Sequence, residues 1–105
     1  MSNYNVTFRL ANRTVNGKSY DERRQQLIDN VHTPGKGYWE EPTSFFLAES
    51  NLNTNDFAAK ACKGLSAADD LVFVFDSADM SASYFGQVKE VDVLRSFFPK
   101  LKKVA

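Results

Sequence analysis

Four aspartates flank the most apolar run of the chain and could support metal chemistry: Asp69, Asp70, Asp76 and Asp79. Two carboxylates at a strand end could hold Mg²⁺ for phosphodiester cleavage. Aspartate also serves in turns, because its side chain accepts hydrogen bonds from nearby backbone amides, and this is its commoner role. The sequence therefore predicts polar turns here, with a metal-dependent nuclease as the alternative. An ion pair between Arg9 and Asp76 would make both residues structural.

Basic residues gather around the first loop and the start of the first helix. Such cations can contact the phosphates of a nucleic acid, although a solvated charged surface is the more frequent explanation. The whole chain has 13 basic and 13 acidic residues, so no overall field attracts a polyanion. Any contact with RNA or DNA must come from this local set. The predicted nucleic-acid-binding residues are Arg9, Arg13, Lys18, Arg23 and Arg24.

The remaining reactive side chains indicate no catalytic residue, no metal site and no cofactor. His32 ends a predicted helix and is the only histidine, so we expect a favourable helix C-terminal charge rather than a general base. Cys62 falls among alanines on an apolar helix face, which predicts a buried thiol rather than a nucleophile. One cysteine excludes an internal disulfide, and with one histidine it cannot complete a zinc site.

Patterns of apolar residues divide the chain into strands and helices. Ser19 and Glu22 match a capping box, which predicts the start of the first helix, and Asn53 supplies cap chemistry for the second. Pro42 indicates a bend, a bulge or an edge position, with the edge favoured for the second strand, because proline cannot donate to a ladder. The expected elements are strands 4–10, 44–48, 70–76 and 83–88, a helix 20–32, a second helix that Gly64 and Ser66 end, and a C-terminal helical stripe over 91–101.

The most apolar run predicts a central strand that is buried on both faces. Leu71, Phe73 and Phe75 point to one face, whereas Val72 and Val74 point to the other. We expect Phe73 to face the two crossover helices, so that Phe73→Ala would lose about 3 to 5 kcal/mol of stability. The C-terminal helix or a second subunit would then cover the face of the two valines.

This order of elements predicts one α+β domain over residues 1–105, a ferredoxin-like β-α-β-α-β-β sandwich with a C-terminal helix. The composition agrees with a globular domain, since 43% hydrophobic and 25% charged residues are near average values. The chain does not open with a pattern typical of a signal peptide, and no run approaches about 18 apolar residues. We therefore expect a cytoplasmic protein without membrane contact.

Particular stretches of the chain resemble a family of small proteins. They are the start Tyr4-Asn5-Val6-Thr7-Phe8, the helix after a Ser/Tyr-Asp junction, the pair Tyr38-Trp39 five residues before Ser44-Phe45-Phe46-Leu47, and the run Asp69-Asp70-Leu71-Val72-Phe73-Val74. Over about residues 4–86 the chain resembles the SinR-like proteins, which are related to the CRISPR-associated dimeric spacer-acquisition subunit and to virulence-associated protein D.

The resemblance implies a homodimer joined through its sheets. Some members are metal-dependent nucleases that use an aspartate at the end of the first strand. Arg9 stands at that position here, and a cation cannot ligate a metal, so the resemblance carries over the scaffold and the dimer but not the nuclease reaction.

Three functional hypotheses follow from the residues and the resemblance. The leading one is a non-catalytic homodimer that binds a partner, RNA or DNA, through the basic edge. One alternative is a metal-dependent nuclease that uses Asp76 or Asp79. The other is a protein-interaction or regulatory module without a nucleic-acid role, which the zero net charge favours.

Overall fold

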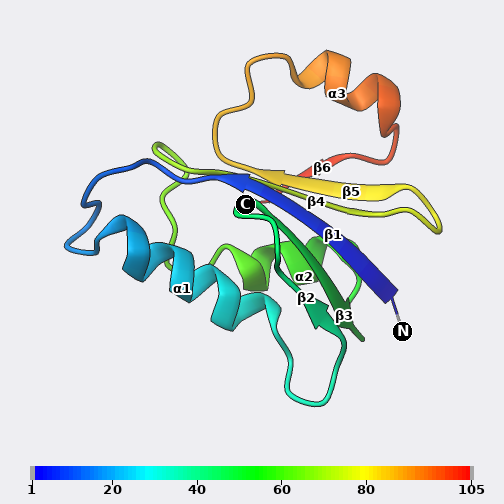
Figure 1. Ribbon diagram of the computed structural model, residues 1–105. Helices are drawn as coiled ribbons and strands as arrows, with labels where there is room; N and C mark the ends of the chain where they lie inside the picture. The colour runs from blue at the N-terminus through cyan, green and yellow to red at the C-terminus, as the bar shows by residue number, and fades with distance from the viewer. Residues whose placement is uncertain (1, 105) are drawn as a thin grey trace.

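The computed structural model describes residues 2–104, which form an α+β domain of three helices and one six-stranded mixed sheet (Figure 1). The elements are β1 (Ser2–Arg9), α1 (Tyr20–Val31), β2 (Tyr38–Trp39), β3 (Phe45–Ser50), α2 (Thr54–Ala61), β4 (Leu71–Asp76), β5 (Ser81–Phe85), α3 (Val91–Phe97) and β6 (Lys102–Lys103). The strands follow the order β2-β3-β1-β4-β5-β6 across the sheet. Neighbouring strands are antiparallel, except for β5 and β6, which are parallel.

Two short strands, β2 and β6, add to those expected from the sequence. β1 and β4 occupy the two central positions of the sheet, in agreement with the prediction that they are central. β3 was expected at an edge, and this was wrong, because β2 pairs along its outer side. Pro42 lies instead in the connection between β2 and β3, where its missing N–H removes no hydrogen bond from the ladder.

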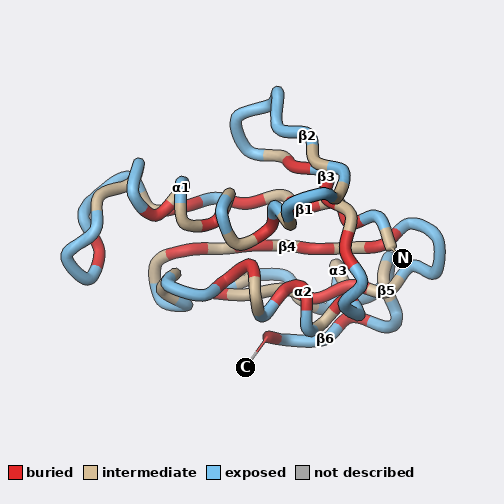
Figure 2. Tube along the Cα trace, turned by 90° about the horizontal axis from the view of Figure 1, so that it is seen from below, coloured by how far each residue is buried: buried red, intermediate tan, exposed pale blue. Residues whose placement is uncertain are grey.

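Helices α1 and α2 begin at the predicted caps and cover one face of the sheet (Figure 1). The Glu22 amide donates to Ser19 Oγ at 3.1 Å, and the Ser19 amide donates to Glu22 Oε1 at 2.9 Å, which completes the capping box. Asn53 caps α2 by accepting a hydrogen bond from the Asp56 amide at 2.8 Å. Figure 2 shows buried residues along β4 and along α2, where the core lies between sheet and helices.

The two faces of β4 are reversed relative to our expectation. Val72 and Val74 lie opposite Phe8 and Val6 in the β1–β4 ladder, and all four belong to the buried core that the helices cover. Phe73 therefore faces away from α1 and α2, and the predicted orientation was wrong. Alternation fixes which side chains share a face, but it does not say which of two apolar faces meets the helices.

The C-terminal segment covers part of the opposite face. Phe98, one residue beyond α3, lies against Phe73 and Phe75, with 5.2 Å between the ring centroids in each pair. Figure 1 shows α3 on the side of the sheet away from α1 and α2. The part of that face formed by β1, β3 and β2 is more open, since Trp39 and Leu47 are 41% and 40% exposed.

Phe73→Ala should lower the free energy of unfolding by about 1 to 3 kcal/mol, less than truncation of a fully buried phenylalanine. The ring is half-buried and loses contacts with Phe75 and Phe98. Urea denaturation measures the change, with Leu52→Ala as the control, since Leu52 is exposed in the loop before α2 and we expect a loss of less than about 1 kcal/mol there. Equal losses in the two variants would contradict the covering role of the C-terminal segment.

Candidate functional site

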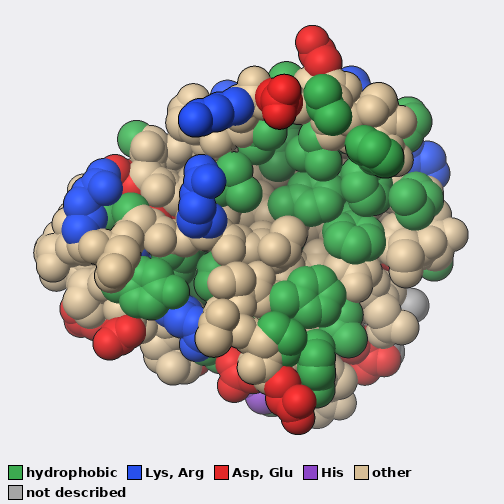
Figure 3. All heavy atoms as spheres, turned by 45° about the horizontal axis from the view of Figure 1, so that its top comes forward, with side chains coloured by type: hydrophobic (Ala, Val, Ile, Leu, Met, Phe, Trp, Pro, Cys, Tyr) green, Lys and Arg blue, Asp and Glu red, His purple; other side chains and the backbone are tan. Residues whose placement is uncertain are grey.

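Three of the five predicted nucleic-acid-binding residues are exposed. Arg9 ends β1 and lies opposite Leu71 in the ladder, on the face away from α1 and α2. Arg13 is in the following loop and forms an ion pair with Asp69. Lys18 is exposed near the end of the same loop. In the view of Figure 3, most of the visible Lys and Arg side chains lie on the left, and others lie at the top and the right.

Arg23 is buried, so it does not belong to an exposed basic surface. Its exposed fraction is 1%, and its Nη2 donates to Asp70 Oδ1 at 2.9 Å and to the Ala11 carbonyl at 2.7 Å. Asp70 also accepts hydrogen bonds from the amides of Ala11 and Ser66, each at 3.0 Å. The buried pair therefore ties α1, the first loop and the loop after α2 to the start of β4.

Arg24 is half-buried and is held by its own neighbours. Its Nη2 donates to the Thr43 carbonyl at 3.1 Å. Its guanidinium lies over the rings of Phe8 and Phe46, 5.9 Å and 5.7 Å from their centroids, a favourable cation–π arrangement. The exposed part of the predicted basic set thus consists of the other three residues, which we call the basic corner: Arg9, Arg13 and Lys18.

The four aspartates are divided between the two ends of β4. Asp69 and Asp70 precede the strand, whereas Asp76 ends it and Asp79 follows in the next turn. A strand of this length separates the pairs by roughly 15 to 20 Å, so the two pairs cannot share one ion. Within residues 2–104, no three His, Cys, Asp or Glu side chains are grouped so that they could hold a metal ion.

The ion pair expected between Arg9 and Asp76 does not form. Because β1 and β4 are antiparallel, Arg9 lies opposite Leu71 at the start of β4, and Asp76 lies at its other end. Asp76 instead accepts a hydrogen bond from the Ala78 amide at 2.9 Å.

His32 and Cys62 occupy structural positions. His32 is the C-cap residue of α1, and its ring stacks on Tyr38 with 4.8 Å between centroids. Burial, and to a lesser degree the charge of Asp70, raises the pKa of the Cys62 thiol to about 12. The thiol is therefore protonated at neutral pH, which does not suit a nucleophile.

The less covered part of the sheet is apolar in its middle and charged at its ends (Figure 3). Trp39 and Phe45 meet edge to face, with 6.4 Å between ring centroids, and Leu47 pairs with Trp39 in the ladder. Arg9 lies at one end of β1, and Glu49 lies opposite Asn3 near the other end. We call this surface the open sheet face; it consists of Asn3, Asn5, Thr7, Arg9, Trp39, Phe45, Leu47 and Glu49.

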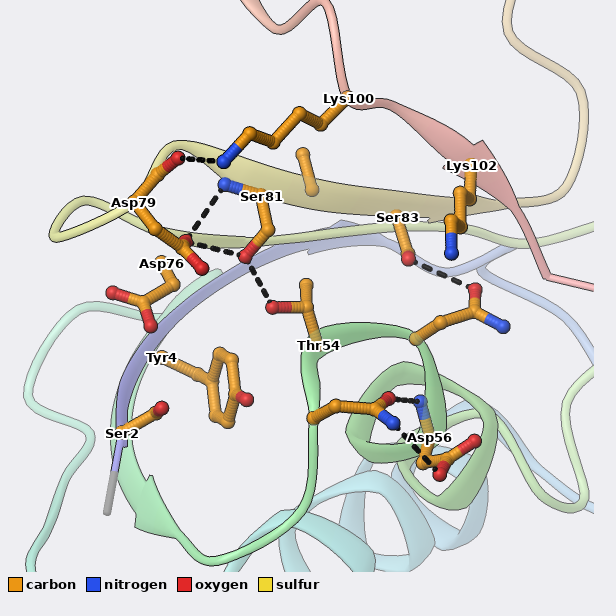
Figure 4. Close-up of a pocket in the computed structure, with 13 residues that line it drawn as sticks. Ser2, Tyr4, Thr54, Asp56, Asp76, Asp79, Ser81, Ser83, Lys100 and Lys102 are labelled. Carbon is orange, nitrogen blue, oxygen red and sulfur yellow. Dashed lines mark hydrogen bonds between the residues drawn. The ribbon is translucent and has the colours of Figure 1, made fainter.

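A polar cleft of about 710 Å³ lies beside α2, a volume typical of small-molecule sites (Figure 4). Its walls come from β1, the start of α2, the turn between β4 and β5, and the strands β5 and β6. The lining residues, which define the polar cleft, are Ser2, Tyr4, Asn53, Thr54, Asn55, Asp56, Asp76, Asp79, Ser81, Ala82, Ser83, Lys100 and Lys102.

Hydrogen bonds link α2 to the turn between β4 and β5 across the cleft. The hydroxyl oxygens of Thr54 and Ser81 are 2.5 Å apart, and Ser81 Oγ donates to Asp79 Oδ1 at 2.6 Å. The hydrogen bonds from the Ser81 side chain and amide lower the pKa of Asp79. Lys100 Nζ donates to the Asp79 carbonyl at 3.0 Å, so this end of the cleft combines hydroxyls, a carboxylate and an ammonium group.

The other end of the cleft carries hydrogen-bond donors. Ser83 Oγ donates to Asn55 Oδ1 at 2.9 Å, which leaves the Asn55 amide nitrogen as a donor. Lys102 is the partner of Ser83 in the parallel β5–β6 ladder, and Figure 4 shows the two side chains close together.

The polar cleft was not identified from the sequence. Asn53 was interpreted only as a helix cap, and the aspartates only as turn residues or metal ligands. A signal was present in β5, where Ser81 and Ser83 alternate on the face that elsewhere carries the apolar core. Polar residues at core-facing positions indicate a site that a solvent molecule or a ligand can reach.

No family model matches this chain, and no curated protein or solved structure matches it either. None of the helices within residues 2–104 is both long and apolar enough to cross a membrane. Function therefore has to be inferred from the basic corner, the open sheet face and the polar cleft.

Proposed function

We propose that this protein is a non-catalytic homodimer that pairs through its open sheet face and binds RNA or DNA through its basic corner. The observation that carries the proposal is the open sheet face itself. Large side chains such as Trp39 and Leu47 are exposed on it, and Arg9 of the basic corner lies at its end. A contiguous apolar surface with a polar rim is typical of an interaction site.

The proposed fold is ferredoxin-like, with β5, α3 and β6 as additions. Its support is the antiparallel order β2-β3-β1-β4, together with the chain order β1-α1-β2-β3-α2-β4. The placement of both crossover helices on one face leaves the other face for a partner.

The charges at the ends of the open sheet face support pairing with a second copy. In a two-fold dimer the same surface serves both partners, so each charge meets whatever lies at the symmetry-related position. If the axis runs across the strands, Arg9 of one copy approaches Glu49 of the other. Opposite charges at the two ends and apolar side chains between them therefore make the face complementary to itself.

Leu47→Lys should convert the dimer to a monomer, because it places a charge in the middle of the proposed interface. Sedimentation equilibrium at tens of micromolar measures the change. Leu52→Lys is the matched control, since Leu52 is 38% exposed, close to the 40% of Leu47, but lies in the loop before α2. A monomeric parent, or equal effects of the two variants, would overturn the dimer.

Removal of the basic corner should weaken binding of single-stranded RNA or DNA by at least about tenfold at low salt, because phosphate contacts release counterions. Filter binding measures the affinity. The two triple-alanine variants replace Arg9, Arg13 and Lys18, or, as the control, the exposed Lys63, Lys89 and Lys103. Because Arg9 also belongs to the open sheet face, sedimentation first checks that both variants have the oligomeric state of the parent. Equal affinities of the two variants would overturn the nucleic-acid half of the proposal. A dimeric parent that binds neither polymer would point to a protein-interaction module.

A further inference from the structure

Asp76 is a buried residue that lines the polar cleft, and the protein supplies a hydrogen-bond donor to only one of its two carboxylate oxygens. The residue is 6% exposed, and the Ala78 amide donates to its Oδ1 at 2.9 Å. No donor from residues 2–104 reaches its Oδ2. Among the described residues, the buried side-chain atom without a partner is Arg23 Nε, so Asp76 Oδ2 is open to the cleft, where a hydroxyl of a bound molecule can donate to it.

The cleft contains charged groups of both signs, which favours an uncharged ligand over an ion. Three aspartates and two lysines line it, which leaves one net negative charge: Asp56, Asp76, Asp79, Lys100 and Lys102. A phosphate dianion would add to the negative charge, while an organic cation would have to lie close to two ammonium groups.

Donors and acceptors are distributed along the whole cleft. Asp76 and Asp79 accept at one side of the view in Figure 4, and Lys102 donates at the other. Hydroxyls that can do both, such as those of Thr54 and Ser83, lie between or beside them. A ligand that fits must itself donate and accept at many positions, and this is the chemistry of a sugar hydroxyl.

We propose that the polar cleft binds a neutral sugar, whose hydroxyls donate to Asp76 and accept from Lys102 and the Asn55 amide. The cleft volume of about 710 Å³ suits a mono- or disaccharide. The site is separate from the open sheet face and the basic corner, so the inference stands whether or not the protein dimerises or binds nucleic acid.

Amide NMR spectra recorded during titration with D-ribose, D-glucose and maltose test the proposal. At least one of these sugars should shift the amide signals of Thr54, Ser81 and Ser83 in a saturable way, with a dissociation constant of about 1 to 10 mM or tighter. Inorganic phosphate and ethylammonium, added separately, should shift these signals less than the sugar does.

Variants decide whether the shifts come from the cleft. Asp76→Asn and Lys102→Met should each weaken sugar binding by about tenfold, because each removes a charged hydrogen-bond partner. Lys103→Met is the matched control and should leave the affinity unchanged, since Lys103 pairs with Tyr84 on the other face of the sheet. If Asp76→Asn does not fold, Lys102→Met carries the test alone.

Three results would overturn the inference. One is the absence of any saturable shift with all three sugars. Another is a stronger response to phosphate or ethylammonium, which would assign the cleft to an ion. The last is equal weakening by Lys103→Met and Lys102→Met, which would place the sugar elsewhere.

Discussion

Replacing Arg23 by methionine should lower the free energy of unfolding by about 3 to 5 kcal/mol, as measured by urea denaturation. The substitution leaves the Asp70 carboxylate buried without its ion partner. Removing one partner of a buried ion pair is strongly destabilising, because the remaining charge is neither paired nor solvated. It also removes both Arg23 donors from the Ala11 carbonyl, which keeps only the Arg13 amide, so the first loop loses this attachment to α1.

The exposed ion pair provides the control for this prediction. Arg13→Met breaks the contact with Asp69 and should change stability by less than about 1 kcal/mol, because the Arg13 side chain is 63% exposed and Asp69 still accepts a hydrogen bond from Ser66 Oγ. Adding Asp70→Asn to Arg23→Met should restore part of the loss, since the lone buried charge is then gone. Equal melting curves for Arg23→Met and Arg13→Met would show that the buried pair does not hold the fold together.

Gly86→Ala should lower the free energy of unfolding by about 3 kcal/mol or more, by a combination of backbone strain and steric overlap. Gly86 follows β5 with φ +95°, a conformation that side chains with a Cβ adopt poorly. An added Cβ would also lie 1.9 Å from the Asp70 carbonyl oxygen, which is backbone and cannot rotate away. The effect should appear in the same urea titration.

Gly35→Ala separates the two contributions. Gly35 has φ +81°, but an added Cβ there meets nothing within 4 Å, so only the strain of about 1 kcal/mol remains. A loss at Gly86 no larger than that at Gly35 would mean that β5 can shift away from Asp70. Because Gly86 approaches the backbone of Asp70 while Arg23 holds its side chain, the two sites should also be energetically coupled.

The starts of the helices could be predicted from the sequence because capping is local chemistry. Ser19, Glu22 and Asn53 need only their neighbours within three residues to satisfy a backbone amide. The faces of β4 could not be predicted in this way. Both sides of that strand are apolar, and only the packing of α1 and α2 decides that Val72 rather than Phe73 enters the core.

The spacing of residues in α1 indicated that Arg23 is buried, although its charge suggested an exposed side chain. Arg23 lies four residues before Leu27 and eight before Val31, so it shares the buried face of α1. Its partner Asp70 is 47 residues away, and no local pattern shows that the two will meet. The polar cleft could not be predicted from local patterns for the same reason, since Tyr4, Thr54 and Lys102 come together only in the folded chain.

The central position of β1 has a consequence for how the chain folds as it is made. One neighbour of β1 is β4, and the side chain of Asn5 bonds to the Phe75 carbonyl 70 residues later. During synthesis from the N-terminus, β1 therefore lacks this neighbour until the residues of β4 have left the ribosome. Contacts between such distant residues slow folding, so nascent chains should expose the edge of β1 for longer than any later strand, and protection from aggregation matters most in that interval.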